Sequence, residues 1–342
     1  MQITNTLKEL LSIPAISGFE SDFHHILKNK LYNFCSDVKI TSSGCVLGII
    51  PSKNSCGKSI MIEAHLDRIG LIVSEILEDG FLKFKTVGGV DERILPTAEV
   101  TVLGRESVYG VIGAKPPHLL PKAEEKDTLK IENMTIDTGF DTETLKSKIS
   151  VGDPVLLNSK FSELLCGRVA SAALDNRAGM TAVFESLEKI MDSNCPYDIY
   201  ICFTKGEETG LHGAYTLGKI KPDLAIVVDV THGTTPDAPK TGTFPLGSGV
   251  AICRGPNLHY DYTLSAVSLA KKKNISYTIE VASGHTGTNA WAIQTLAGGI
   301  PCVLLSIPLR YMHTSVEVVD ISDIEATASL ISELVSGGVE LA

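Results

Sequence analysis

The stretch YDIYICFTKGEETG, residues 197–210, passes from a mostly apolar run into two adjacent carboxylates, Glu207 and Glu208. Short, near-continuous apolar runs are typical of strands that are buried on both faces of a sheet. Four further runs have this character: SIMIEAH (59–65), LAIVVDV (224–230), YTIEVAS (277–283) and PCVLLSIP (301–308). Because helix-like stretches follow most of them, the sequence predicts an α/β fold with helices covering the sheet.

The long segment between SIMIEAH and YDIYICFT has a different pattern. It contains the short β-like runs LIVSEIL, FLKFKTV, AEVTVLG, YGVIGA and DPVLLN, joined by Gly, Pro and charged turns. We therefore predict a β-rich domain at 71–161, inserted into an α/β domain formed by 1–70 and 162–342. The apolar spacing also predicts helices at about 3–11 and 21–34, and the charges of PKAEEKDTLK (121–130) predict a solvated loop.

Composition and charge restrict the class of protein. Of the 342 residues, 44% are hydrophobic and 20% are charged, which fits a folded protein rather than a disordered one. The formal net charge of −10 argues against general binding to nucleic acid or anionic membranes. The start of the chain lacks a secretory signal pattern and no apolar run is long enough to span a bilayer, so we expect a cytoplasmic protein. The eight cysteines form no CxxC pair and are expected to be reduced.

Polar residues follow the predicted strands at points where a binding site is expected. Ligands of open α/β sheets bind beyond the carboxyl ends of the strands, and four of these ends carry a possible metal ligand or proton-transfer group. A further carboxylate stands in ALDNRAGM, just before a predicted helix that starts near Asn176. The candidate residues are His65, Asp67, Asp175, Glu207, Glu208, Asp229 and His313.

Each candidate has a structural explanation when it is taken alone. Asp175 fits the N-cap of the following helix, and Glu207 and Glu208 fit the acidic first turn of a helix. Asp229 fits a turn in a loop rich in Thr and Gly, and a lone histidine is often simply hydrogen-bonded. The convergence of five separate segments on one predicted edge of the sheet is what favours a functional site.

The residue types indicate what such a site binds. One ligand from each of the five segments gives two histidines and three carboxylates, without cysteine, which is the set expected for a pair of divalent ions such as Zn²⁺, Co²⁺ or Mn²⁺. A shared carboxylate would bridge two ions about 3.5 to 4 Å apart, the usual separation in two-metal hydrolases. Asp67 stands two residues after His65 and is suitably placed to accept the other ring N–H of that histidine.

A resemblance to a known family is carried by a series of segments in this order: AHLDRIG, ALDNRAG, GEETGLHGA, VVDVT, GTNAWAIQTLAGGIP and SIPLRYMHTSVEVVD. They resemble the dinuclear metallo-aminopeptidase family of clan MH, which includes the TET peptidases, glutamyl and lysyl aminopeptidases and members labelled endoglucanase. The segments VGGVDER, GVIGAKPPHLL and VGDPV resemble its β-barrel-like dimerisation domain. The resemblance implies a mixed sheet flanked by helices in a zinc-peptidase-like catalytic domain, with a small inserted barrel.

The resemblance also implies a metal ligand set. Asp175 would bridge two divalent ions in each subunit. His65 and Asp229 would complete one site, and Glu208 and His313 would complete the other. The ions would be Zn²⁺, with Co²⁺ and Mn²⁺ as alternatives.

Glu207 would be the general base in this comparison, with Asp67 as a second catalytic residue. A base must reach the attacking water without being held as a ligand itself, which explains the use of two adjacent glutamates. The implied reaction is the hydrolytic release of amino-terminal residues from short peptides. The implied assembly is a homo-oligomer built from dimers, with a dodecamer as the expected form.

Three positions depart from the family pattern. Arg68 stands where Glu is common, Gly206 where Gln or a similar residue is common, and Asn289 where Asp is common. None of these changes removes a ligand, but Arg68 reverses a charge beside the ligands. Arg68 is therefore either a structural or surface arginine, or a group that favours substrates with an acidic amino-terminal side chain.

Three other functions fit parts of the pattern. An endoglucanase-type glycosidase needs carboxylates about 5 to 9 Å apart across a sugar bond, which neighbouring glutamates at one strand end supply poorly. An N-acyl amino acid deacylase would use the same ions on a blocked amine. An inactive scaffold would not need the complete ligand set. His212, His232 and His285 lie near the predicted cleft in sequence and receive no role.

Overall fold

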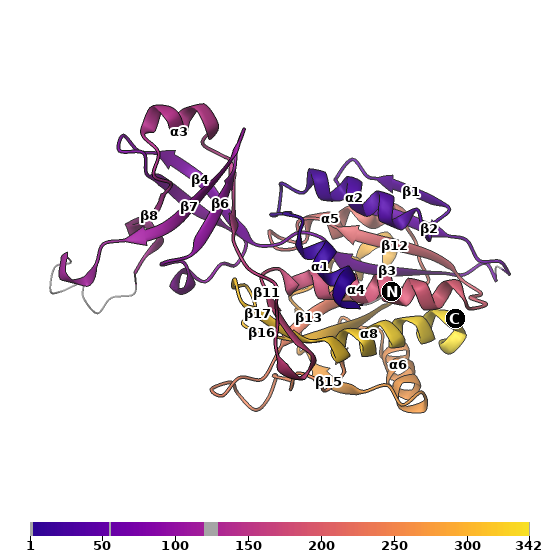
Figure 1. Cartoon of the computed structure of the whole chain (residues 1–342). Helices are drawn as coiled ribbons and strands as arrows, with labels where there is room; N and C mark the ends of the chain where they lie inside the picture. The colour runs from indigo at the N-terminus through magenta and orange to yellow at the C-terminus, as the bar shows by residue number, and fades with distance from the viewer. Residues whose placement is uncertain (1–2, 55, 120–128, 342) are drawn as a thin grey trace.

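The five apolar runs are strands in the structure. They are β3 (Ser59–His65), β12 (Asp198–Thr204), β13 (Leu224–His232), β15 (Tyr277–Val281) and β16 (Cys302–Arg310). All five belong to one sheet in the computed structural model, which describes residues 3–54, 56–119 and 129–341 (Figure 1). Because β12, β3, β13 and β16 are neighbours and run parallel, their carboxyl ends meet at one edge of the sheet.

The sheet is mixed, and the predicted fold class is confirmed. Among the described residues it has 11 strands. Six strands, each two to five residues long, were not predicted, because a short segment gives only a weak hydrophobic period. They are β1 (Asp37–Ile40), β2 (Val46–Ile50), β10 (Ser162–Glu163), β11 (Arg168–Ser171), β14 (Val250–Arg254) and β17 (Glu317–Asp320). The order is β1-β2-β12-β3-β13-β16-β17-β11-β10, with β14 beside β16 and β15 beside β14.

Helices cover both faces of this sheet. One layer contains α1 (Ile3–Leu11), α2 (Ser21–Leu31), α4 (Leu174–Met191), α6 (Tyr260–Lys272) and α8 (Ile321–Glu333), and the other contains α5 (His212–Tyr215) and α7 (Ala290–Ile293). In β3, Ile60 and Ile62 pack against the first layer and Met61 against the second, since alternate side chains of a strand point to opposite faces. The first helix has the predicted bounds, and α2 ends three residues before the predicted Phe34.

The segment after β3 forms a closed antiparallel barrel beside the main sheet (Figure 1). Its strands, in spatial order, are β4 (Gly70–Ile76), β5 (Leu82–Val87), β8 (Met134–Asp137), β7 (Ser107–Ala114), β6 (Glu99–Leu103) and β9 (Pro154–Leu157). The sequence prediction missed β8, which is four residues long, and the helix α3 (Thr142–Lys148), whose N-cap is Asp141. The domain boundaries at 70 and 161 remain predictions.

Two further expectations concern a solvated loop and membrane-spanning helices. The loop predicted at 121–130 falls mostly outside the described residues, so only its last two residues have a described position. In the part of the chain that the structure describes, every helix is too short or too polar to cross a membrane.

Candidate metal centre

The carboxyl ends of the parallel strands bring the predicted residues together. His65 is the last residue of β3, the turn carrying Glu207 and Glu208 follows β12, and Asp229 lies within β13. His313 follows β16, and Asp175 lies at the start of α4. These five segments form two groups of side chains that are suited to hold a metal ion, and both groups include Asp175.

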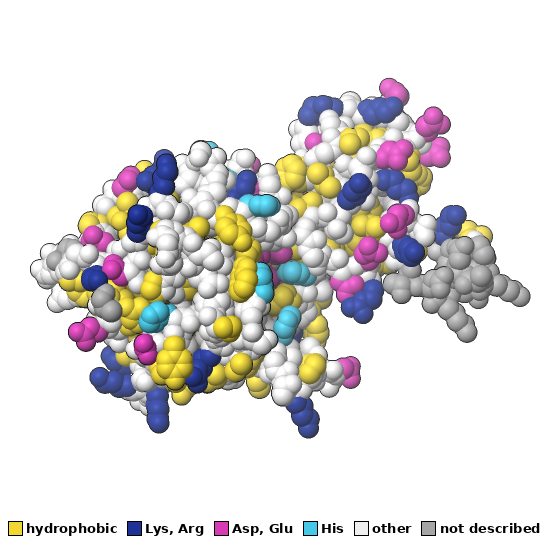
Figure 2. All heavy atoms as spheres, turned by 180° about the vertical axis from the view of Figure 1, so that it is seen from behind, with side chains coloured by type: hydrophobic (Ala, Val, Ile, Leu, Met, Phe, Trp, Pro, Cys, Tyr) yellow, Lys and Arg dark blue, Asp and Glu magenta, His cyan; other side chains and the backbone are white. Residues whose placement is uncertain are grey.

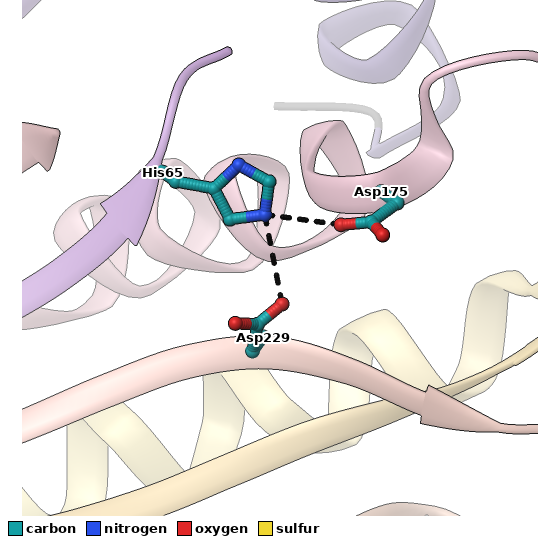
Figure 3. Close-up of side chains that lie close together, drawn as sticks. All are labelled: His65, Asp175 and Asp229. Atoms are coloured by element: carbon teal, nitrogen blue, oxygen red, sulfur yellow. Dashed lines mark hydrogen bonds and ion pairs between the residues drawn. The ribbon is translucent and has the colours of Figure 1, made fainter. Parts of the chain in front are cut away.

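The first group consists of His65, Asp175 and Asp229, which point toward one another (Figure 3). His65 Nε2 lies 3.0 Å from Asp175 Oδ1 and 3.6 Å from Asp229 Oδ1. Asp229 is inside β13, paired with Ser306 of β16, so its interpretation as a turn residue is wrong. The strand continues three residues past Asp229, to His232, further than the sequence predicted.

The second group consists of Asp175, Glu208 and His313. His313 Nε2 lies 3.3 Å from Asp175 Oδ2 and 3.3 Å from Glu208 Oε2. Asp175 thus presents one carboxylate oxygen to each group. Ligand atoms about 2.0 to 2.2 Å from a tetrahedral Zn²⁺ lie about 3.4 Å apart, so the spacing of both groups fits a metal ion.

The start of α4 explains why Asp175 is free to face both groups. Asn176 Oδ1 accepts a hydrogen bond from the backbone N–H of Gly179, three residues further on, which is the geometry of an N-cap. The interpretation of Asp175 as the cap is therefore wrong, because its neighbour has that role. The Asp175 carboxylate instead faces His65 and His313.

Asp67 connects β3 to the turn that carries the two glutamates. Its carboxylate accepts hydrogen bonds from the backbone N–H groups of Glu207 (3.1 Å) and Glu208 (3.2 Å). Its carbonyl oxygen lies 3.1 Å from His65 Nδ1, closer than its carboxylate Oδ1 at 3.6 Å. The sequence interpretation gave the histidine contact to the carboxylate, but the backbone oxygen is the nearer partner, and the carboxylate positions the turn.

The two glutamates face different surroundings. Glu208 contacts His313, whereas Glu207 lines a cavity of about 290 Å³ together with Asp175, Asp229 and His313. The turn contains no helix until α5 begins at His212, so neither glutamate occupies a helical first turn. The adjacent carboxylates therefore point to two separate tasks.

Burial and mutual repulsion govern the charge of these carboxylates. Burial raises the pKa of Glu207 to about 9, and the nearby Asp229 and Asp175 add to the shift. Burial also raises the pKa of Glu208 and of Asp229, with Asp175 contributing to both. Buried carboxylates this close together need positive charge to remain ionised, and a divalent cation is a form of charge that His, Asp and Glu donors fit.

Glu317 is a buried residue of the site that the sequence prediction missed. Its Oε2 accepts a hydrogen bond from the backbone N–H of Asp175 (3.1 Å), and its Oε1 accepts one from the backbone N–H of His313 (2.9 Å). Burial raises the pKa of Glu317 to about 8 and Asp175 adds to this, while the Arg68 guanidinium favours its charged form. A signal was present, because Glu317 follows His313 by four residues in the quoted segment HTSVE.

The three departures from the family pattern have structural roles. Arg68 is buried, with 6% of its surface exposed, and its charge partners are Glu317 and Glu208, so it is not a surface arginine. Gly206 has a φ of +67°, in the left-handed region, and a Cβ there would lie 3.3 Å from His212 Cβ. Asn289 Nδ2 donates a hydrogen bond to the buried Glu63 at 2.8 Å.

The three unassigned histidines have different positions. His232 lines the cavity, at the end of β13. His212 begins α5 beside Gly206. The ring of His285 packs 4.5 Å from that of Trp291. On the face seen in Figure 2, several histidine side chains lie where the sheet and its helices meet the barrel.

Comparison with known proteins shows the family of this chain. The family model of the M42 glutamyl aminopeptidases matches residues 44–330. The chain belongs to this family. The lysyl aminopeptidase of Pyrococcus furiosus is 30% identical over 96% of this chain and 95% of its own length.

Two solved structures illustrate the likeness. The TET aminopeptidase of a marine sediment archaeon, Thaumarchaeota archaeon SCGC AB-539-E09, superimposes with a TM-score of 0.92, 29% identity and coverage of 98% of this chain and 96% of that chain. The TET1 peptidase of Pyrococcus horikoshii has a TM-score of 0.85, 29% identity and coverage of 98% and 99%, and it assembles into a tetrahedron or a large octahedral shell. The chain is an M42 aminopeptidase, a hydrolase, and this reading is favoured over the glycosidase, deacylase and scaffold alternatives.

Proposed function

We propose that this M42 aminopeptidase depends on two divalent metal ions per subunit, Zn²⁺ first, with Co²⁺ or Mn²⁺ as alternatives. The observation that carries the proposal is the placement of Asp175, with Oδ1 at 3.0 Å from His65 Nε2 and Oδ2 at 3.3 Å from His313 Nε2. Asp229 completes the ligands on the His65 side, and Glu208 completes them on the His313 side. Asp175 is the shared ligand.

The residues of the site have different roles in peptide hydrolysis. Bound divalent ions polarise a substrate carbonyl and lower the pKa of water, which is the chemistry that they supply in hydrolases. Glu207 lines the cavity without belonging to either ligand group among the described residues, so its carboxylate is free to take the proton from the attacking water and deliver it to the leaving amine. The contact between the Asp67 carbonyl and His65 Nδ1 fixes the ring so that Nε2 faces the site. Asp67 therefore acts by positioning.

A test combines metal removal with a choice of substrates. The purified protein is dialysed against a chelator and assayed with leucine p-nitroanilide, and Zn²⁺, Co²⁺ or Mn²⁺ is then added back. We expect activity to be lost and then restored by at least one ion. Full activity after verified removal of all metal would overturn the proposal.

The same preparation separates the alternative enzymes. N-acetyl-leucine p-nitroanilide has a blocked amine, so release of p-nitroaniline from the free amine form alone supports an aminopeptidase, whereas release of acetate from the acetylated form indicates a deacylase. Hydrolysis of carboxymethylcellulose that survives chelation would indicate a glycosidase. No turnover of any substrate in the metal-loaded protein would support the scaffold.

We also propose that short peptides are the substrates and that the chain forms a homo-oligomer based on dimers, with a dodecamer as the expected assembly. The likeness to the TET1 peptidase supports this, because that relative forms closed shells. Native mass spectrometry tests the proposal. A mass of twelve chains is the expected result, and a monomer at micromolar concentration would contradict it.

A further inference from the structure

The cavity beside the ligand groups extends along β13 past Asp229. Beyond the ligands it is lined by Val230, Thr231 and His232 of β13, by Glu280 of β15 and by Met312. These residues have no role in the chemistry proposed above. A cavity that begins at the reacting centre and continues past it is where a substrate side chain is held.

The position of Glu280 is set by a hydrogen bond to β13. Thr231 Oγ1 donates to Glu280 Oε1 at 2.6 Å. Thr231 stands two residues after Asp229 on the same strand, so its side chain points to the same face and its Cα lies about 6 to 7 Å further along. The Glu280 carboxylate therefore lies one side-chain length away from the metal ligands, at the wall of the same cavity.

The carboxyl group of Glu280 lies in this part of the cavity wall. Within the described residues, the cavity lining contains no lysine or arginine, and no ion pair joins Glu280 to a basic side chain. Burial raises the pKa of the Glu280 carboxyl group, and among its neighbours His232 favours the ionised form while Asp229 opposes it. A substrate cation placed here would stabilise the ionised carboxylate, and a substrate anion would be repelled.

We propose that Glu280 is the specificity-determining residue of this aminopeptidase and selects peptides whose amino-terminal residue is lysine or arginine. The ammonium or guanidinium group pairs with the Glu280 carboxylate, and the methylene stem lies along Met312. This inference rests on the proposed aminopeptidase function and names its substrate class. It is not given by the family, whose name refers to glutamyl substrates while the Pyrococcus furiosus relative is named for lysyl substrates.

The distance along β13 favours the side chain over the α-amine as the partner of Glu280. The α-amine is two bonds from the scissile carbonyl carbon and must stay beside the reacting centre. The lysine ammonium is six bonds away and is able to reach a group about 6 to 7 Å along the strand. If Glu280 held the α-amine, every substrate would need it equally.

The inference reverses the expectation based on Arg68. That arginine is buried, the charges of Glu317 and Glu208 favour its charged form, and it is not among the described residues that line the cavity. Its positive charge is therefore balanced by carboxylates of the protein itself. The charged group that faces the cavity beyond the ligands is an acid.

The test measures kcat/KM for the p-nitroanilides of lysine, arginine, leucine and glutamate with the Zn²⁺-loaded enzyme. The variants are Glu280→Gln and Glu280→Lys. The control is Glu163→Gln, which makes the same change of side chain at an exposed ion pair. We expect wild type and Glu163→Gln to prefer lysine and arginine over glutamate by at least about tenfold. Glu280→Gln loses about tenfold or more on lysine and arginine while leucine changes by less than about threefold, and Glu280→Lys shifts the preference toward glutamate.

Each failure has a distinct meaning. Absence of turnover of all four substrates by the loaded wild type contradicts the proposed aminopeptidase itself. Turnover of leucine without preference for lysine or arginine over glutamate leaves that function standing and overturns the inference. An equal loss on leucine and lysine in Glu280→Gln also overturns it, because it assigns Glu280 to the α-amine. Circular dichroism of Glu280→Gln, which differs from wild type only in one amide, verifies that the variant is folded.

Discussion

Replacement of Glu317 by glutamine tests whether one buried carboxylate holds the two metal ligand groups in place. Each oxygen of Glu317 accepts one backbone N–H, from Asp175 and from His313, which are 142 and four residues away in sequence. Glutamine retains one acceptor oxygen and turns its NH₂ group toward the other N–H. One hydrogen bond to a charged acceptor is therefore lost, and two donors face each other in a buried site.

The size of the effect follows from that loss. A hydrogen bond to a charged group contributes about 1.5 to 3 kcal/mol, and about 1.4 kcal/mol corresponds to a factor of ten. If the lost hydrogen bond lets the metal ligands move, the affinity for the metal ion falls by about 10- to 100-fold, the range usual for groups that orient metal ligands. The weaker ion should be the one held by His313 and Glu208, since the His313 backbone is fixed by the shorter of the two bonds.

A matched control is present elsewhere in the chain. Asp323 is also buried, and its two oxygens accept the backbone N–H groups of Gly247 and Gly249, with no contact to the ligand groups among the described residues. Zn²⁺ affinity is measured by competition with a chromophoric chelator in wild type, Glu317→Gln and Asp323→Asn. Both variants should lose stability, but only Glu317→Gln should bind Zn²⁺ more weakly.

Two results would refute this reasoning. Unchanged affinity and turnover in Glu317→Gln would mean that the residue is neutral in the metal-loaded protein and that an amide replaces it without loss. Equal weakening of metal binding in Asp323→Asn would mean that the effect is a general loss of stability.

Three further predictions concern stability. Asn289 Nδ2 lies 2.8 Å from Oε1 of the buried Glu63, so Asn289→Asp places a second carboxylate there and should lower the free energy of unfolding, measured with urea, by about 2 to 4 kcal/mol. Adding Glu63→Gln should recover most of this loss, and no recovery would show that the two groups do not interact. Gly206→Gln should cost about 1 to 2 kcal/mol because of its left-handed backbone, whereas an unchanged unfolding midpoint would mean that the turn adapts freely. Zn²⁺ at about 100 times its dissociation constant should raise the free energy of unfolding of the chelated protein by about 2.7 kcal/mol per site, and equal thermal midpoints with and without Zn²⁺ would contradict binding to the folded state.

The sequence indicated candidate site residues where a polar residue stands at the end of an apolar strand. The residues after β3, β12 and β16 were found because an apolar run ends in a polar group, and that pattern is local. Asp175 was found in the same way, beside a predicted helix start, although its neighbour Asn176 proved to be the cap.

Two acidic residues inside strands, Glu280 and Glu317, were not predicted. Glu280 lies within YTIEVAS and Glu317 begins β17, so both looked like ordinary members of an apolar pattern. Their roles depend on partners in other segments, Thr231 for Glu280 and Asp175 for Glu317, 49 and 142 residues away. A hydrophobic period carries no information about such distant contacts. The same limit explains why Asp67 was assigned to His65 and not to the turn after β12.

The central claim is that the neighbouring glutamates of the turn after β12 have separate tasks, Glu208 at a metal ion and Glu207 at a proton. The most direct test measures bound Zn²⁺ by mass spectrometry and turnover of a preferred p-nitroanilide in Glu207→Gln, with Glu208→Gln as its pair. We predict that Glu207→Gln retains two equivalents of Zn²⁺ and loses about 10²- to 10⁴-fold in kcat, whereas Glu208→Gln loses about one equivalent. Near-normal turnover in Glu207→Gln, or loss of its metal, would contradict the account.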